Sequence, residues 1–313
     1  MLVREIGSRL EVPACGPFPR HAFFQAHFLQ PHRKHSPMHT YTNTTALVTG
    51  ASKGLGEAYA RELASRGAHL VLVARSADAL HALADEIRAA HAVRVDVIAA
   101  DLADRRSPQR VLDALDGLGL DVDLLVNNAG MGAVGPFLGR PLAPNLQSVD
   151  VNVTALVGLV HLLGARMVER GRGGIVNIAS TAAFQPMPYQ ASYAATKAFV
   201  LSFTEAVAEE VRGTGVRVMA AHPGATATGF FDRTTASMNP RFTDAPGDVA
   251  ARTLDDFARG RAVSFPGRAS QRIGVWASRV LPRTTVTRVT GALNRRLGFR
   301  DVSDRDPAAA PGQ

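Results

Sequence analysis

Three glycines punctuate the segment Thr49–Gly56, Thr-Gly-Ala-Ser-Lys-Gly-Leu-Gly, which lies between an apolar run at 45–48 and an apolar helical pattern. A strand, a glycine turn and a helix in this order form the phosphate site of dinucleotide-binding folds. Gly50 permits the tight turn, Gly54 lets the backbone approach a pyrophosphate, and Gly56 allows close helix packing beside unpaired N–H groups. Because many glycine clusters are plain turns and this spacing is not the common G-x-G-x-x-G, the prediction depends on the flanking elements.

Strand-like and helical segments alternate from Thr44 onward, which predicts an α/β fold with a doubly wound parallel sheet. At 313 residues and 46% apolar composition, one Rossmann domain over residues 41–267 with a seven-stranded sheet is the economical expectation. The predicted strands begin at or span Leu47, His69–Ala74, Val93–Ala99, Leu124–Val126, Ile175–Ile178, Val216–Ala220 and Ala262–Phe265.

Tyr193 and Lys197 are four residues apart, a spacing that places them on one face of a helix. A free phenol titrates at about 10, and a nearby ammonium stabilises the phenolate and lowers that pKa. Such a phenol can exchange protons with an alcohol or ketone. A pair like this is usually a solvated helix face, but the chain has only three lysines among 35 basic residues, so lysine is not generic positive charge here.

Two buried strands end in polar residues, in the segments Asp123–Gly130 (DLLVNNAG) and Ile175–Ser180 (IVNIAS). Ligands of open parallel sheets bind beyond the carboxyl ends of strands, so these side chains are candidates for a site. Asn152 lies at the start of an apolar helix. It is either an interior amide bonded to backbone or a third member of the site.

In order and spacing these motifs resemble the short-chain dehydrogenase/reductase family over about residues 44–265. The glycine motif, the NNAG run and Pro223-Gly224 all match, and Ser180 precedes Tyr193 by the family's usual thirteen residues. The nearest likeness is to bacterial reductases of acyl or lipid ketones. By resemblance the catalytic set is Asn152, Ser180, Tyr193 and Lys197.

The resemblance also implies roles within this set. Tyr193 is the general acid/base, Ser180 orients the substrate oxygen, Lys197 binds the nicotinamide ribose and tunes Tyr193, and Asn152 holds a water that extends a proton relay. Ser180 and Tyr193 are donors that would meet negative charge as it grows on a carbonyl oxygen.

The cofactor is predicted to be NADP(H). Arg75 and Ser76 follow the second strand, where an NAD site carries an acid, and Lys53 adds a second cation in the glycine turn. Arg75 can also be an ordinary surface arginine. Either Thr226 or Thr228 is expected at the carboxamide. The predicted cofactor-binding set is Gly50, Ser52, Lys53, Gly54, Leu55, Gly56, Arg75, Ser76, Asp101, Leu102, Asn128, Ala129, Gly130, Tyr193, Lys197, Pro223, Gly224, Thr226 and Thr228.

The substrate is expected to be an apolar carbonyl compound or its alcohol, such as a 3-oxoacyl chain or a steroid-like ketone. The predicted function is an NADP(H)-dependent oxidoreductase, and the alternative is a non-catalytic NADP(H)-sensing protein on the same fold. By resemblance a homodimer or homotetramer would form through helices near 150–170 and 191–212. The residues expected to frame the substrate are Met131, Val134, Phe137, Phe184, Met187, Phe230, Phe231, Met238 and Phe242.

The two ends differ from the domain. Residues 1–40 are predicted to be a disordered extension, with Met38 as an alternative translation start, and residues 301–313 a disordered tail. Residues 268–300 form a predicted basic helical extension, in which Pro282 separates two helices. Nine arginines and no acid occur in 261–300, so this region holds the chain's excess charge. Three interpretations stay open, namely a membrane surface with anionic lipid, a cover over the substrate pocket, and a subunit contact.

Other partners and compartments are not indicated. No histidine or cysteine spacing suggests a metal site, and the basic charge lacks a nucleic-acid reading motif. Apolar stretches are interrupted by Arg, Gly or Asp before about 20 residues, which predicts no membrane-spanning helix. The single cysteine cannot form an intrachain disulfide. We therefore expect a cytoplasmic protein with possible peripheral contact to the membrane.

Overall fold

The computed structural model describes residues 41–231, 234–236 and 243–303. Contacts divide the chain into Met1–Pro37 and Met38–Gln313, and the fold described here belongs to the second unit. The expected N-terminal extension at 1–40 with its Met38 start, and residues 304–313 of the expected tail, lie outside the described residues.

The sheet is parallel and seven-stranded, with the order β3-β2-β1-β4-β5-β6-β7, which confirms the predicted doubly wound fold. Strand order reverses between β1 and β4, where ligands of such sheets bind. The third strand begins two residues later than expected, and the seventh is reduced to two residues. The strands are β1 Thr45–Thr49, β2 His69–Ala74, β3 Val95–Ala99, β4 Leu124–Asn127, β5 Gly173–Ile178, β6 Val216–Ala221 and β7 Val263–Ser264.

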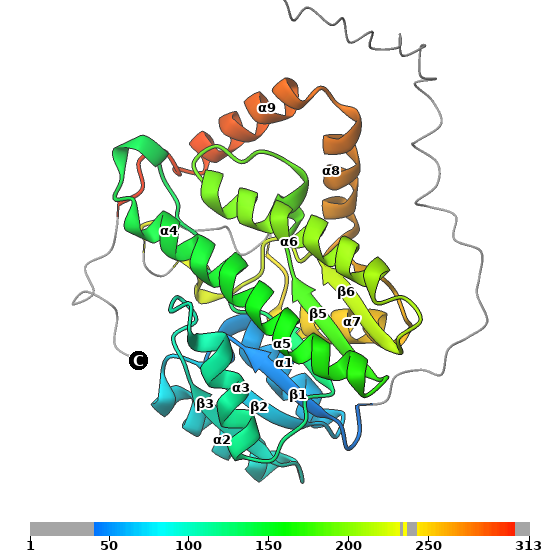
Figure 1. Ribbon diagram of the computed structural model, residues 1–313. Helices are drawn as coiled ribbons and strands as arrows, with labels where there is room; N and C mark the ends of the chain where they lie inside the picture. The colour runs from blue at the N-terminus through cyan, green and yellow to red at the C-terminus, as the bar shows by residue number, and fades with distance from the viewer. Residues whose placement is uncertain (1–40, 232–233, 237–242, 304–313) are drawn as a thin grey trace, which may run out of the picture. The chain divides into compact units, whose positions relative to one another are not determined.

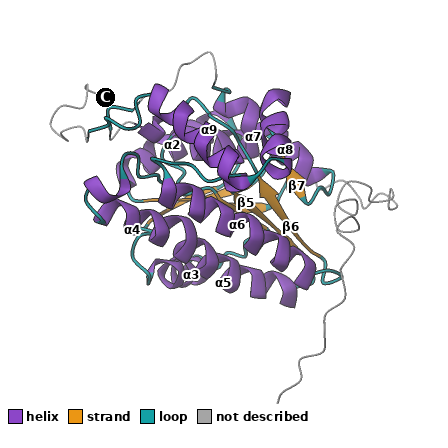
Figure 2. Cartoon of the chain, turned by 90° about the horizontal axis from the view of Figure 1, so that it is seen from above, coloured by secondary structure: helices purple, strands orange, loops and turns teal. Residues whose placement is uncertain are grey.

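Helices cover both faces of the sheet (Figure 2). Alternate side chains of each strand point to opposite faces, so Val48 packs with one helix layer and Leu47 with the other. One layer consists of α1 Gly54–Ser65, α2 Ala77–Ala90 and α7 Pro246–Ala258. The other contains α3 Ser107–Gly117, α4 Ala143–Val149, α5 Leu156–Glu169 and α6 Ala191–Glu210. Short helical turns are η1 Phe137–Gly139, η3 Thr181–Phe184 and η4 Gly229–Phe231, and the wide turn η2 Asp150–Ala155 joins α4 to α5.

Residues Ala143–Glu169 form a continuous 27-residue helix with a mean hydropathy of 1.6 in its most apolar window. By length and composition this helix could cross a bilayer, contrary to the sequence expectation, and it is the one such helix in the described part of the chain. The sequence prediction treated residues such as Asp150 as the ends of apolar stretches, but a long helix tolerates a single polar residue of this kind. Leu159, Leu163 and Met167 pack into the core beside the sheet. Its apolar composition therefore fits a helix that covers a sheet, so by itself it is weak evidence for a membrane span.

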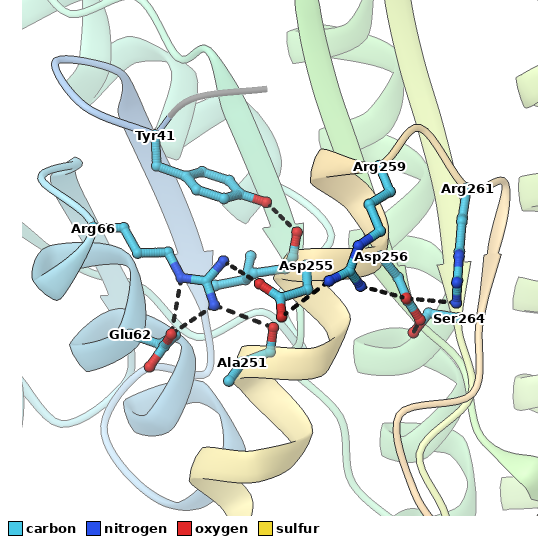
Figure 3. Close-up of polar contacts among 10 residues, drawn as sticks. Tyr41, Glu62, Arg66, Ala251, Asp255, Asp256, Arg259, Arg261 and Ser264 are labelled. Carbon is cyan, nitrogen blue, oxygen red and sulfur yellow. Dashed lines mark hydrogen bonds and ion pairs between the residues drawn. The ribbon is translucent and has the colours of Figure 1, made fainter. Parts of the chain in front are cut away.

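Polar contacts tie the start of the described chain to α7, and α7 to α1 and β7 (Figure 3). The Tyr41 hydroxyl donates to the Leu254 carbonyl at 2.6 Å. Arg66 at the end of α1 pairs with Asp255 of α7 at 2.9 Å. Asp256 accepts from Arg261 at 2.7 Å and from the Ser264 hydroxyl of β7 at 2.8 Å. Acid and base thus pair closely where α1, α7 and β7 meet.

Two helices follow the sheet, α8 Ala269–Val280 and α9 Arg283–Arg296, and Pro282 lies between them as predicted. Figure 1 places both beyond the ends to which β5 and β6 point. The chain then packs back on the domain, because Phe299 and Val302 form a buried cluster with Val134. Residues Asp301–Ser303 were expected to begin the disordered tail. They pack instead because Val302 finds apolar neighbours and Ser303 bonds to Thr235.

Candidate active site

The glycine turn between β1 and α1 is too tight for side chains. Gly50 and Gly54 have φ values of +65° and +62°, in the left-handed region that favours glycine. A Cβ on Gly56 would lie 2.1 Å from the Gly50 carbonyl oxygen. Lys53 precedes the helix and its side chain makes no capping bond, so it leaves the first N–H groups of α1 to other acceptors. These features fit a turn that receives a phosphate group, and Ser52 and Leu55 lie part-buried within it.

Arg75 lies at the same sheet edge as the glycine turn. Thr49 pairs with Val73 in the parallel register of β1 and β2, and Arg75 follows two residues later. Its side chain is exposed, and no ion pair holds it among the described residues. Ser76 is the N-cap of α2, and its hydroxyl accepts a hydrogen bond from Ala79 N.

Asp101 and Leu102, the two residues predicted for the site after β3, differ in exposure. Asp101 is exposed and accepts the Ala103 N–H at 3.0 Å, whereas Leu102 is buried in the core. Only Asp101 therefore offers its side chain to solvent at the sheet edge.

Thr49 fixes the turn after β4 to the turn after β1. Its hydroxyl accepts from Asn128 N at 3.0 Å and Ala129 N at 2.9 Å, and Asn128 Nδ2 donates to the Thr49 carbonyl at 3.0 Å. Asn127 continues the bracing by donating to Asn177 at 3.0 Å. Sequence reasoning did not include Thr49 in the site, although its place directly before Gly50 was the available signal.

Tyr193, Ser180 and Lys197 meet between β5 and α6. Ser180 is buried at the carboxyl end of β5, where its Oγ accepts from Ala182 N at 3.1 Å and donates to the Pro223 carbonyl at 3.4 Å. It also lies near enough to Tyr193 to lower the pKa of the phenol. Lys197 is 5% exposed, donates to the Ile178 carbonyl at 2.7 Å, and has its Nζ 5.8 Å from the Tyr193 ring centroid. The helical spacing of the sequence thus brings the phenol, the hydroxyl and the ammonium together.

Burial is the main cause of the pKa shifts of Tyr193 and Lys197. It raises the pKa of the Tyr193 phenol above its ordinary value of 10, and the Ser180 hydrogen bond only partly opposes that shift. Burial also lowers the pKa of Lys197 to about 8. The expected lowering of the tyrosine pKa by Lys197 is not found, because removing the phenolate from water costs more than the ammonium supplies at this separation.

Asn152 lies in the wide turn η2 and uses both ends of its amide. Its Oδ1 accepts from Met131 N at 2.9 Å, and its Nδ2 contacts Met131 O, Ser148 Oγ and Thr196 Oγ1 at 2.9, 3.2 and 2.9 Å. These contacts match the interior-amide interpretation. Asn152 is nevertheless beside the site, because a Cβ on Gly130 would lie 3.3 Å from Asn152 Oδ1 and 3.4 Å from Lys197 Nζ.

The segment after β6 distinguishes the two candidate threonines. A Cβ on Gly54 would lie 3.2 Å from the Thr228 side chain, which places Thr228 against the glycine turn. Both hydroxyls donate to nearby backbone, that of Thr226 to the Gly224 carbonyl at 3.2 Å and that of Thr228 to the Thr226 carbonyl at 3.5 Å. The Pro223 carbonyl accepts from Thr181 N at 3.0 Å. Of the two threonines, Thr228 is thus the one that lies against the glycine turn.

The expected substrate lining is only partly assembled. Phe230 lies edge-on to Tyr193, with ring centroids 5.1 Å apart. Phe184 turns instead toward His222 and Phe265, and Val134 is buried against Phe299 and Val302. Phe137 is exposed. Met131 and Met187 are part-buried, whereas Met238, Phe242 and the side chain of Phe231 lie outside the described residues.

His222 is a buried residue behind Ser180. Its Nδ1 lies 3.3 Å from the Ser180 carbonyl oxygen, and its Nε2 has no hydrogen-bond partner among the described residues. Burial lowers the pKa of His222 to about 4, so the ring is neutral near pH 7. The His222 ring is therefore hydrogen-bonded at one nitrogen only among the described residues.

The C-terminal helices hold the loop that joins Ser180 to Tyr193. Thr290 donates to the Pro186 carbonyl at 3.0 Å, and Asn294 donates to the Pro188 carbonyl at 2.8 Å. Ser278 of α8 reaches the Phe184 carbonyl at 3.4 Å. Of the three interpretations of this extension, a cover beside the substrate side of the site thus has direct contacts in its favour.

The model of the short chain dehydrogenase family matches residues 44–239, more than half of the chain. The chain is a short-chain dehydrogenase/reductase. The family assignment agrees with the order of the glycine turn, Ser180 and the Tyr193–Lys197 pair along the sheet, and it makes this protein an oxidoreductase.

Relatives of this short-chain dehydrogenase/reductase include very-long-chain 3-oxoacyl-CoA reductases. The enzyme of Anas platyrhynchos is 32% identical over 267 residues, 82% of this chain and 81% of the relative. The enzyme of Homo sapiens is 36% identical over 187 residues, covering 58% of this chain but only 59% of the human protein. A short-chain dehydrogenase from Sphingobium yanoikuyae in complex with NADPH has a TM-score of 0.68 and 33% identity, covering 75% of this chain and 93% of that structure.

Proposed function

We propose that this protein is an NADP(H)-dependent oxidoreductase that interconverts an apolar ketone and its secondary alcohol. The observation that carries the proposal is the convergence of Ser180 and Tyr193 beside buried Lys197, whose Nζ lies 5.8 Å from the centre of the phenol ring. A hydroxyl and a phenol that converge in this way can hold one oxygen atom between them. That arrangement suits a carbonyl oxygen whose negative charge grows during reduction.

Tyr193 transfers the proton. Its raised pKa keeps the phenol protonated near pH 7, as a proton donor to the substrate oxygen requires. Ser180 donates a hydrogen bond to the same oxygen and sets its direction. When bound, the nicotinamide supplies the hydride for reduction or accepts it for oxidation. Lys197 lies beside Gly130 and Asn152, where it can hold a ribose hydroxyl and pass a proton toward solvent.

Arg75 and Lys53 give the proposed preference for NADP(H). Both side chains are exposed at one edge of the sheet, where Arg75 follows β2 and Lys53 precedes α1. A 2′-phosphate requires positive charge at this position, whereas an NAD site uses an acid to bind the ribose hydroxyls. The NADPH complex of the Sphingobium yanoikuyae relative is consistent with this choice.

The apolar substrate class is supported by Phe230 beside Tyr193 and by the names of the two vertebrate relatives. A long 3-oxoacyl chain or a steroid-like ketone is the proposed type of substrate. Assembly through α5 and α6 as a homodimer or homotetramer also stays a prediction. It is consistent with Phe199, which is exposed on α6 and stacks on Phe203 at 5.7 Å.

The test is the oxidation of NADPH by the purified protein with 3-oxoacyl thioesters, steroid ketones and small aldehydes, and the reverse reaction with the alcohols. Tyr193→Phe removes the proton donor and keeps the ring, so we expect a loss of turnover of about 10³-fold, within the range for general acid catalysis. NADPH binding should persist in that variant. Tight NADPH binding with no turnover by the unmodified protein on any substrate pair would favour a non-catalytic sensor.

A further inference from the structure

Each of the two C-terminal helices presents an apolar stripe to solvent. On α8, Ile273 and Trp276 are 67% and 61% exposed, and Val280 follows at the helical spacing. On α9, Val289 and Leu293 are 62% and 54% exposed. The opposite faces are occupied, since α8 and α9 bury other residues and hold the loop at 184–188. The domain covers neither stripe, and we call the two exposed stripes together the outer apolar face.

Exposed arginines lie on the same two helices as the outer apolar face, and none of those that follow has a carboxylate partner among the described residues. The segment 261–300 contains no acid that could pair locally. The Arg279 guanidinium lies over the Phe184 ring at 4.7 Å. The exposed arginines of this set are Arg272, Arg279, Arg283, Arg288, Arg295 and Arg296.

A groove of about 610 Å³ lies along α9. Arg283, Arg288 and Arg295 line it, together with the hydroxyl-bearing Thr284 and Thr287. Guanidinium groups bind phosphate oxygens in a bidentate manner, and hydroxyls add further donors. Pro188 and the buried Gly291 also line this groove, so it lies between α9 and the loop that ends at Pro188, and its arginines suit phosphate groups there.

We propose that the outer apolar face and the exposed arginines of α8 and α9 bind the surface of a bilayer that contains anionic lipid. The aliphatic side chains and Trp276 enter the boundary between headgroups and acyl chains, and the arginines bind lipid phosphates. The protein then lies on the membrane without crossing it through these helices.

Charge decides between a bilayer and a second copy of the chain. A symmetric contact through the outer apolar face brings like-charged arginines of two copies together, and no acid of α8 or α9 can receive them. An anionic bilayer supplies both the missing negative charge and an apolar layer. The same observations thus favour lipid over self-association.

The position of the helices gives this binding a consequence for the site. Thr290 and Asn294 hold the 184–188 loop from the side of α9 that faces away from Val289. If the proposed function is right, docking places the loop that leads to Tyr193 close to the bilayer, where an acyl or steroid substrate dissolves. The binding itself does not depend on that function.

Trp276 makes a direct test possible, because it is the chain's single tryptophan. The full chain is mixed with vesicles of phosphatidylcholine alone or with phosphatidylglycerol added. We expect a blue shift of Trp276 emission and co-sedimentation with the phosphatidylglycerol vesicles, both reduced by high salt. No shift and no co-sedimentation would overturn the proposal.

Two variants and a matched control assign the binding to this face. Arg288→Gln with Arg295→Gln and Arg296→Gln should weaken binding on the order of 100-fold, given the usual contribution of each basic residue near an anionic surface. Ile273→Ser with Val289→Ser and Leu293→Ser should abolish co-sedimentation. The control, Arg88→Gln with Arg94→Gln and Arg212→Gln, removes the same charge from sites paired with acids and should bind normally.

Three further results would contradict the proposal. Equal weakening by the control variant would reduce the effect to net charge. A Trp276 blue shift that grows with protein concentration in the absence of lipid would assign the face to a second copy. Displacement by inorganic pyrophosphate well beyond that by sodium chloride of equal ionic strength would assign the groove to a free phosphate compound. Circular dichroism checks folding of each variant, and NADPH turnover on a small soluble ketone tests the proposed function separately.

Discussion

In the Rossmann domain many exposed arginines lie beside carboxylates, whereas the exposed arginines of α8 and α9 have none beside them in the described structure. Exposed Arg61 pairs with Glu86 of α2, and exposed Arg88 pairs with Asp85. Apolar residues differ in the same way, because the sheet buries both of its faces and α8 leaves Ile273 and Trp276 in solvent. Exposed ion pairs contribute little stability each, so this pairing is evidence about partners and not about strength. The paired arginines of the domain already have anionic partners within the chain. Those of α8 and α9 have none among the described residues, so they are available to bind an external anionic partner.

The largest effect on cofactor affinity that we expect comes from Arg75→Asp. This change places a carboxylate at the position proposed for the 2′-phosphate, so the KM for NADPH should rise about 100-fold through repulsion and loss of a charge-assisted bond. The KM for NADH should change much less. Steady-state kinetics with both cofactors makes the measurement.

Arg61→Asp is the matched control for that charge reversal, since Arg61 pairs with Glu57 and Glu86 on the surface of the same domain. It should leave both KM values near those of the unmodified protein. Equal effects of Arg75→Asp on NADPH and NADH would remove the assignment of Arg75. That result would also weaken the contrast between regions, because Arg75 is the domain arginine for which we propose an external phosphate.

Buried Lys197 should make domain stability depend on pH. Its pKa is lowered to about 8 in the folded protein from 10.5, so the unfolded chain binds more protons between these values and the free energy of unfolding rises with pH. The slope should approach roughly 1.4 kcal/mol per pH unit between pH 8 and 10. Above pH 10 the raised pKa of Tyr193 acts in the opposite direction.

Chemical denaturation of the cofactor-free protein at several pH values tests this effect, with Lys197→Met as the comparison. The neutral variant should lack the added slope between pH 8 and 10. Parallel pH dependences for the two proteins would show that the ammonium does not lose its proton in the folded state within this range.

The sequence predicted the sheet and the placement of the main motifs because both depend on short-range patterns. Apolar runs separated by helical periods gave the strands, and four-residue spacing put Tyr193 and Lys197 on one helix face. The helix 143–169 was misjudged as too interrupted, since a single Asp150 does not end a helix. Its apolar composition becomes understandable only when the sheet it covers is known.

The remaining errors arise from contacts between distant segments. The pKa of Tyr193 follows burial by surrounding elements, which the local pair with Lys197 does not reveal. Asn152 finds Ser148 and Thr196 only in the folded chain. Likewise α9 reaches Pro186 and Pro188 through contacts more than 100 residues apart in sequence. Amphipathicity predicted two unlike faces on these helices but not which face the domain would occupy.

The smallest predicted effect compares two valines on α9. Val286 is 6% exposed and Val289 is 62% exposed. Substitution by alanine therefore removes packing contacts with the protein at Val286, but mainly contacts with solvent at Val289. Val286→Ala should destabilise the docked helix by about 1.5 kcal/mol, and Val289→Ala by much less. Limited proteolysis near α9 and thermal unfolding report this difference. Lipid co-sedimentation should give the reverse order, with the larger loss for Val289→Ala. Should Val289→Ala destabilise α9 as much as Val286→Ala, that valine is covered in the protein by itself, and the distinction between a self-contained domain and an outward-facing pair of helices fails at α9.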